Sequence, residues 1–391
     1  METASATVRR RPTWLVGLVP VVVLAVAIGV FVALDAPGLD RIGVPEEELA
    51  VERAVLHPGE IELHVRNDGA DPVQVKQVIV NDGFAGFTQS TEEIGRLGGA
   101  QVDVQYPWIE GENYEVMLLT STGATIDHSI EAAVETPDAD LGFYGLMALI
   151  GLYVGVIPVA IGMLWLPWIR TVDVRWMRFL LAFTVGLLGF LAIDALLEGT
   201  ELAGEGPQAL GGAALVWLGA VGAYLALAGV DAWLRGRKEK QVSAWRAAFL
   251  VALGIGLHNL GEGLAIGSAY AIGSLALGAA LVVGFALHNT TEGLAIVAPA
   301  AKERVSLGRL ALLGLLAGAP AVLGAWIGAS AFHPSVAAVM FGIGAGAIAQ
   351  VIVQIAPQIR GGDGRLLNPL AAGGLLSGLV VMYATGLLVS V

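Results

Sequence analysis

The chain has 391 residues, of which 56% are hydrophobic and 14% are charged, and its formal net charge is −13. Because a soluble globular domain usually carries about 25% charged residues, this composition excludes an ordinary soluble domain and indicates a membrane protein. The absence of cysteine excludes disulfides and leaves nitrogen and oxygen as the ligands for any metal.

Runs of about 20 apolar residues can cross a bilayer, and they predict nine spans in this sequence. The first covers about 14–34 and follows Arg9, Arg10 and Arg11. It could be a signal peptide, but its apolar run is longer than usual and "DAPGLD" is a poor cleavage site, so we favour an uncleaved anchor. The other eight spans are expected at about 141–168, 178–198, 210–235, 245–271, 274–300, 307–331, 335–357 and 367–390.

Positive charges indicate the orientation, because cytoplasmic loops carry the excess of Lys and Arg. The first three arginines place the N-terminus in the cytoplasm. All thirteen basic residues after position 140 fall in alternate loops or at their edges. The sequence therefore predicts a multi-pass protein of the plasma or inner membrane, with residues 41–137 and the C-terminus outside the cytoplasm.

The segment 41–137 has a different character from the spans. The stretches "EIELHVRN", "VQVKQVIVND", "YEVMLLT" and "ATIDHSIEAAVE" are typical of strands between turn residues, and they predict a small antiparallel β-sandwich. Residues 40–140 hold 21 acidic and 5 basic residues, which either raises the local cation concentration or simply keeps an exposed domain soluble. Its histidines, His57, His64 and His128, could capture metal or could be dispersed surface residues.

Two copies of one motif lie inside apolar stretches. "LHNLGEGLAI" begins at Leu257 and "LHNTTEGLAI" at Leu287, and eight of the ten positions are identical. In a helix, His258 and Glu262 share one face, as do His288 and Glu292. Imidazole and carboxylate together suit Zn²⁺ and similar divalent ions.

The two motif helices are expected to be antiparallel neighbours joined by a tight turn near Gly273. Each histidine is about 15 residues from that turn, so both should lie at a similar depth of roughly 22 Å, and the four side chains can close on one ion. Asn259 and Asn289 could coordinate a second ion or hydrogen-bond between helices. The competing interpretation of the four ionisable residues is polar contact between helices or a proton relay without metal.

The paired motifs "HNLGEG" and "HNTTEG" resemble those of the ZIP (Zrt-, Irt-like) divalent metal transporters, especially bacterial members. The resemblance covers about 141–391 and implies an eight-helix bundle with the motifs on its fourth and fifth helices. It implies that His258, Glu262, His288 and Glu292 form the primary transport site, with Asn259 and Asn289 beside it. It also implies a polar access path for the metal at Asp194 and Glu198, a pair that could instead be a helix end meeting solvent.

The sequence departs from the family where a second ion would be held. Gly261 and Thr291 replace the motif proline, and Ala319 stands where the family often has glutamate. Gln350 and Gln354, with Gln358, form a polar stripe without charge in the seventh helix of the bundle. These changes favour a mainly mononuclear centre.

The expected molecule is an α-helical polytopic membrane protein with a cytoplasmic tail and anchor (1–40), an acidic β domain (41–137) and an eight-helix ZIP-like transport domain (138–391). We expect a transporter that moves a divalent metal, with Zn²⁺ first and Fe²⁺, Mn²⁺ or Cd²⁺ as alternatives, into the cytoplasm. The metal is then the transported substrate, and we expect no prosthetic group, no catalytic residues and no nucleic-acid partner. The expected partners are the metal, the lipid bilayer and a second copy in a homodimer. The alternatives are an intramembrane metal-dependent hydrolase, which lacks its usual HExxH signature here, and a sensor, which lacks an output module.

Overall fold

The computed structural model describes residues 20, 22–30, 47–130, 132–138, 140–235, 244–271, 275–330, 333–360 and 368–387. The chain divides into two compact units, Met1–Pro45 and Glu46–Val391. The predicted anchor at 14–34 and the predicted turn near Gly273 lie largely outside the described residues. Within the anchor, residues 22–30 are helical.

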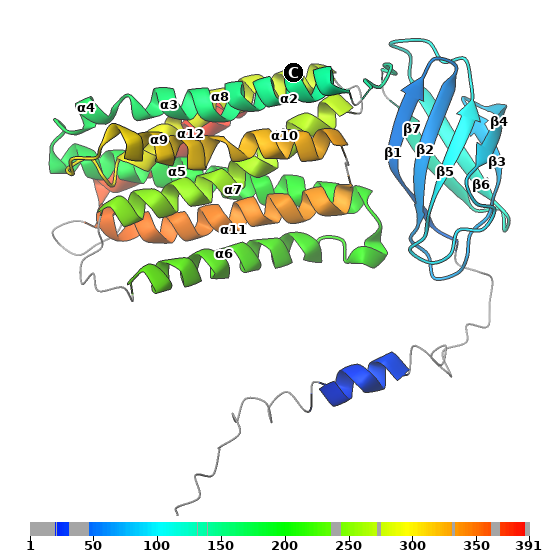
Figure 1. Cartoon of the computed structure of the whole chain (residues 1–391), viewed down its shortest axis with the longest axis horizontal. Helices are drawn as coiled ribbons and strands as arrows, with labels where there is room; N and C mark the ends of the chain where they lie inside the picture. The colour runs from blue at the N-terminus through cyan, green and yellow to red at the C-terminus, as the bar shows by residue number, and fades with distance from the viewer. Residues whose placement is uncertain are drawn as a thin grey trace, which may run out of the picture. The chain divides into compact units, whose positions relative to one another are not determined.

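Seven strands form a nearly closed antiparallel sheet, which confirms the predicted small β fold (Figure 1). They are β1 (Leu49–His57), β2 (Glu60–Asn67), β3 (Val75–Val80), β4 (Gly83–Gln89), β5 (Gly99–Gln105), β6 (Tyr114–Thr120) and β7 (Thr125–Ile130). Side chains alternate along the strands, so that Ile61, Leu63 and Val65 of β2 point into the core and their neighbours do not. This alternation gives the sheet one apolar face and one polar face.

The strand order β1-β2-β5-β4-β3-β6-β7 is that of a constant-type immunoglobulin sandwich. Such a sandwich also has a tyrosine at the start of its sixth strand that bonds to nearby backbone. Here the hydroxyl of Tyr114 accepts a hydrogen bond of 2.8 Å from the N–H of Ile109. This bond fixes the loop that leads into β6.

The rest of the chain is helical. Its elements are α2 (Leu141–Gly151), the π-helical turn η1 (Leu152–Val156), α3 (Ile157–Met163), α4 (Leu166–Ile169), α5 (Val174–Glu205), the 3₁₀ turn η2 (Gln208–Leu210), α6 (Ala214–Arg235), α7 (Ala244–Ala271), α8 (Leu275–Val297), α9 (Leu307–Gly318), α10 (Pro320–Ser330), α11 (Pro334–Ile359) and α12 (Pro369–Leu387).

Seven helical segments in the described part are long and apolar enough to cross a membrane. They are Leu141–Ile169, Val174–Gly204, Gln208–Leu234, Ala244–Ala271, Leu307–Ser330, Pro334–Ile359 and Pro369–Leu387. The predicted span at 274–300 coincides with α8, in which Leu281–Val297 is a shorter apolar stretch. A polytopic helical protein is therefore supported. Seven of the nine predicted spans match these segments, whereas the anchor lies largely outside the described residues and α8 has only the shorter apolar stretch.

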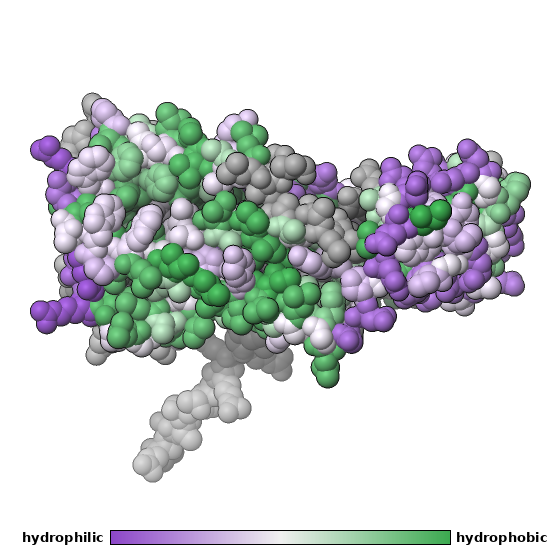
Figure 2. All heavy atoms as spheres, turned by 90° about the horizontal axis from the view of Figure 1, so that it is seen from above, coloured by the Kyte–Doolittle hydropathy of each residue, from purple (hydrophilic) through white to green (hydrophobic). Residues whose placement is uncertain are grey.

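The surface over the helices is largely apolar, whereas the surface over the strands is largely polar (Figure 2). The exposed apolar side chains include Trp217, Leu218, Val221 and Leu225 of α6. Such a broad apolar surface is expected where lipid replaces water.

Helix α7 is the most enclosed of the long helices, and it lies between α10 and α11 (Figure 1). In its most apolar stretch 72% of the residues are buried, against 22% for α6 and for α12. Glycine allows this close packing: a Cβ added at Gly263 would lie 2.0 Å from the carbonyl oxygen of Ala321 in α10. The motif on α7 is thus held deep inside the bundle.

Candidate metal centre

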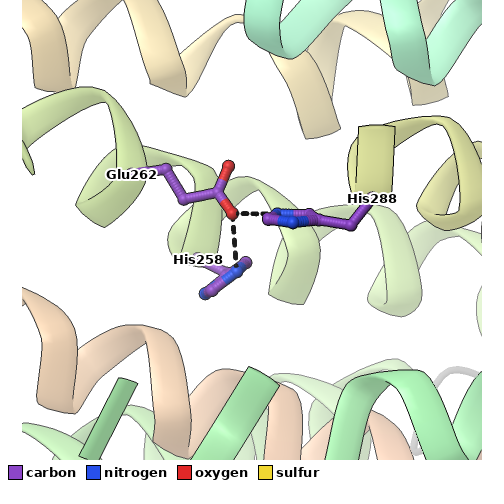
Figure 3. Close-up of side chains that lie close together, drawn as sticks. All are labelled: His258, Glu262 and His288. Carbon is purple, nitrogen blue, oxygen red and sulfur yellow. Dashed lines mark hydrogen bonds and ion pairs between the residues drawn. The ribbon is translucent and has the colours of Figure 1, made fainter. Parts of the chain in front are cut away.

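Three side chains of the repeated motif lie together between α7 and α8 (Figure 3). Glu262 is in the centre, one helical turn after His258. The Nε2 atom of His258 lies 3.0 Å from Oε1 of Glu262, and Nε2 of His288 contacts the same oxygen from α8. All three side chains are buried, so their mutual contacts replace those with water.

These three residues form a group that could hold a metal ion. One donor atom from each lies within 4.8 Å of the others, and no other such group of three occurs among the residues that the structure describes. The two imidazole rings are 6.4 Å apart and inclined by 39°. Two nitrogens and one carboxylate oxygen are the ligand set found in many Zn²⁺ sites.

The two motif asparagines donate hydrogen bonds to backbone in other spans. Nδ2 of Asn259 donates to the carbonyl oxygen of Ala317 at 3.0 Å. Nδ2 of Asn289 donates to the carbonyl oxygen of Val154 at 3.2 Å and also to Oε2 of Glu262 at 2.9 Å. Both oxygens of Glu262 are therefore engaged, one by histidines and one by Asn289.

Four buried oxygen atoms near the cluster have no hydrogen-bond partner in the described part of the chain. They are Oδ1 of Asn259, Oδ1 of Asn289 and both carboxylate oxygens of Glu292. Glu292 is only 2% exposed, and it stands outside the group of three. Burying a carboxylate without a partner is costly, so the Glu292 carboxylate favours a proton or a bound cation. The two amide oxygens are neutral and can accept a hydrogen bond or bind a cation.

A cavity of about 80 Å³ adjoins the cluster. Its lining includes the three clustered residues and apolar side chains such as Phe341. It also includes Asp194 and Glu198 of α5, the two acidic residues that were predicted to form the access path. Asp194 and Glu198 therefore open into the same space as the cluster.

The predicted polar stripe lies apart from this centre. Gln350 is buried and accepts a hydrogen bond of 3.0 Å from Nε2 of Gln354. Neither glutamine belongs to the group of three or lines the cavity. The two side chains bond to each other within α11.

The histidines of the sheet do not gather. His64 pairs with Glu62 on the same strand at 2.6 Å, whereas His57 ends β1 and His128 lies in β7. None of them joins a group of three potential metal ligands within the described ranges. Burial lowers the pKa of His128, which favours the neutral imidazole.

Two features of the centre were not predicted from the sequence. A Cβ added at Gly344 of α11 would lie 3.3 Å from Cα and 3.4 Å from Nδ1 of His258, so this glycine makes room for the ligand. The π-helical turn η1 contains Val154, whose carbonyl oxygen accepts the hydrogen bond from Asn289. The available signals were a glycine in an apolar span and Pro158 just after η1.

A comparison with models of known protein families finds no match for this chain, and a comparison with curated proteins finds none either.

Proposed function

We propose that this protein moves a divalent metal cation, Zn²⁺ first, across a membrane by way of the His258–Glu262–His288 cluster. The observation that carries the proposal is this buried cluster, set among membrane-length helices and joined by one cavity to Asp194 and Glu198. A cluster that served only to join helices would not need a cavity beside its ligand atoms. The paired motifs, which resemble those of the ZIP transporters, support the same function.

The chemistry of the site favours a dication over a neutral solute. Ionisable side chains inside a membrane are expensive, and they usually mark an ion pathway. Glu262 and Glu292 together supply two negative charges when ionised, and one divalent ion balances both. The neutral histidines and the unpartnered oxygens of Asn259 and Asn289 can then complete the coordination without adding charge.

The proposed route begins at the outer end of α5. Asp194 and Glu198 would collect the ion there and pass it to the cluster. An inside-negative membrane potential favours inward movement of a 2+ ion by about 4.6 kcal/mol per 100 mV, twice the value for one charge. Release would follow when protons replace the metal on the histidines and carboxylates.

Uptake of Zn²⁺ into proteoliposomes tests the proposal. Glu262→Gln and His288→Gln should each reduce uptake to the level of empty liposomes, because the first removes the central negative charge of the cluster and the second removes one of its two imidazoles. Glu201→Gln is the matched control, since Glu201 is an exposed carboxylate on the same helix as Asp194, and it should transport normally.

Folding of each variant is checked by size-exclusion chromatography and circular dichroism. Uptake at the normal rate by a folded Glu262→Gln protein would contradict the proposal. Metal-dependent cleavage of a membrane peptide without metal uptake would favour the alternative of an intramembrane hydrolase.

A further inference from the structure

Two of the membrane-length segments are broken by proline near the metal centre. In the first, Pro158 follows the π-helical turn η1, where the N–H of Ile157 bonds five residues back to Leu152. In the second, Pro320 separates α9 from α10, and the N–H of Val322 bonds only three residues back to Ala319. Proline has no N–H, so each break leaves carbonyl groups without their helical donor.

One motif asparagine reaches a carbonyl that lost its donor to proline, and the other reaches a carbonyl beside such a position. In an uninterrupted α-helix residue 158 would donate to the carbonyl of Val154, and it is this carbonyl that accepts from Nδ2 of Asn289. Pro320 likewise leaves the carbonyl of Leu316 without its donor, and Asn259 donates to the next carbonyl, that of Ala317. Each copy of the motif is therefore tied to a different broken span.

The two breaks also contact each other. A Cβ added at Gly155 would lie 2.3 Å from the carbonyl oxygen of Gly318, and one added at Gly318 would lie 2.6 Å from Cα of Val156. Helix α7 approaches equally closely, because a Cβ at Gly256 would lie 2.3 Å from the carbonyl oxygen of Leu316. Backbone meets backbone at these points, so the two breaks and α7 are closely packed.

These contacts determine how each asparagine amide is turned. A carbonyl oxygen can only accept a hydrogen bond, so the NH₂ group of each asparagine must face it. The second hydrogen of the Asn289 amide is then available to Oε2 of Glu262, to which it donates at 2.9 Å. Each amide oxygen is left buried without a partner.

We propose that Pro158 is a positioning residue of the metal centre. By freeing the carbonyl of Val154 it orients Asn289, and through Asn289 the first span holds Glu262 in place for the metal. This inference rests on the proposed function, since it assumes that the cluster binds metal.

A double-mutant cycle on metal affinity tests the inference, with Zn²⁺ binding to the purified full chain measured by isothermal titration calorimetry. Asn289→Ala should weaken binding by roughly 10-fold, the usual effect of losing a group that orients a ligand. Pro158→Ala restores an N–H for the carbonyl of Val154 and should weaken binding by roughly 3- to 10-fold. In the Asn289→Ala background, Pro158→Ala should have no further effect.

Two controls separate positioning from a general loss of structure. In the Asn259→Ala background, Pro158→Ala should keep its full effect, because Asn259 bonds to the other break. Pro357→Ala removes a proline inside α11 that has no bond to either asparagine among the described contacts, and it should leave the affinity unchanged. Pro158→Ser restores the same N–H and takes the place of Pro158→Ala in the cycle, should that variant fail to fold.

The possible outcomes separate a failure of this inference from a failure of the proposed function. If the unmodified protein binds Zn²⁺ but the effects of Pro158→Ala and Asn289→Ala multiply, the positioning role is overturned and the proposed function stands. Equal effects of Pro158→Ala in both asparagine backgrounds would overturn it too. If the unmodified protein binds no divalent metal at all, the proposed function falls and this inference falls with it.

Discussion

The two glutamates of the repeated motif have different surroundings although the sequence around them is nearly identical. Glu262 contacts both histidines and accepts from the amide of Asn289. Glu292 is equally buried, yet neither of its oxygens has a hydrogen-bond partner in the part of the chain described. Glu292 is therefore the residue that most needs a cation or a proton.

Replacing Glu292 by glutamine tests this difference. Glutamine has the same shape and no charge, so Glu292→Gln should keep or raise the Tm of the metal-free protein by a few degrees, since it removes an unpartnered buried carboxylate. The rise in Tm on adding Zn²⁺ should become smaller, because the stabilisation by a bound ion grows with the logarithm of its concentration divided by its Kd, and a weaker site has a larger Kd. Thermal-shift measurements with and without Zn²⁺ check both effects.

Glu201→Gln is the control for this prediction and should change neither quantity. A lower Tm of the metal-free Glu292→Gln protein would show that the carboxylate is already satisfied. An undiminished Zn²⁺ shift would show that Glu292 takes no part in binding.

The sequence could predict that His258, Glu262 and His288 lie close together, but not this asymmetry. Two matching motifs at matched depth suggest four equivalent ligands around one ion. Their environment differs, because α7 is packed against α10 and α11 whereas α8 is packed against α3. Those neighbours come from distant parts of the chain, and no local pattern specifies them.

At the scale of elements, Gly344 of α11 leaves room for His258 of α7, because glycine has no side chain. Gly344→Val would place methyl groups where the backbone and ring of His258 now lie. Overpacking of this kind typically costs about 1–3 kcal/mol, and here it should displace a ligand without removing one. We expect Zn²⁺ affinity to fall by on the order of 10-fold while the protein remains inserted and monodisperse, as measured by calorimetry and chromatography.

Gly222→Val is the matched control. Gly222 lies on α6, where an added Cβ meets nothing within 4 Å, so this variant should bind Zn²⁺ normally. Equal losses in both variants would mean that His258 is not positioned by the contact with Gly344.

The strand β7 carries a group whose titration should affect the sheet. Burial lowers the pKa of His128 below its ordinary value of 6.5. The folded chain then binds this proton more weakly than the unfolded chain, so protonation favours unfolding. The stability of the sheet should be full above about pH 6.5 and should fall as the pH drops below that value.

Hydrogen exchange of the β6 and β7 amides in the full chain can measure this dependence. Exchange through opening of the sheet should become easier between pH 7 and pH 5, after correction for the intrinsic rate. His128→Gln should flatten the profile. An unchanged profile in that variant would assign the pH dependence to another group.

Strongly patterned elements were predictable, and weakly patterned ones were not. The stretches "EIELHVRN" and "YEVMLLT" are the strands β2 and β6. The strands β1, β4 and β5 were not predicted. In β4, "GFAGFTQ", two glycines and the exposed Phe84 weaken the alternation. The span predicted at 307–331 consists of two helices, since Pro320 interrupts the backbone hydrogen bonds that hydropathy does not detect.

At the scale of the whole molecule, the chain combines an acidic β-sheet domain with an apolar helical bundle. Under the proposed orientation the sheet faces the side from which metal arrives, and its negative charge raises the local cation concentration. Deleting residues 47–135 should leave transport at saturating Zn²⁺ intact and raise the half-saturating concentration several-fold. Uptake measured over a range of Zn²⁺ concentrations checks this.

Salt provides the control for the deletion. At 1 M ionic strength, where charges are screened beyond about 3 Å, the intact and truncated proteins should have the same half-saturating concentration. Complete loss of transport in a correctly inserted truncation would show that the sheet belongs to the transport machinery itself.

The enclosure of α7 has a consequence for how the protein responds to its lipids. A bilayer that is thicker or thinner than the apolar length of a helix makes that helix tilt, at a cost of a fraction of a kcal/mol per Å of mismatch. Such a mismatch would act first on α6 and α12, whose apolar stretches are only 22% buried. Since α7 lies between α10 and α11, bilayer thickness can reach His258 and Glu262 only through the helices packed around them.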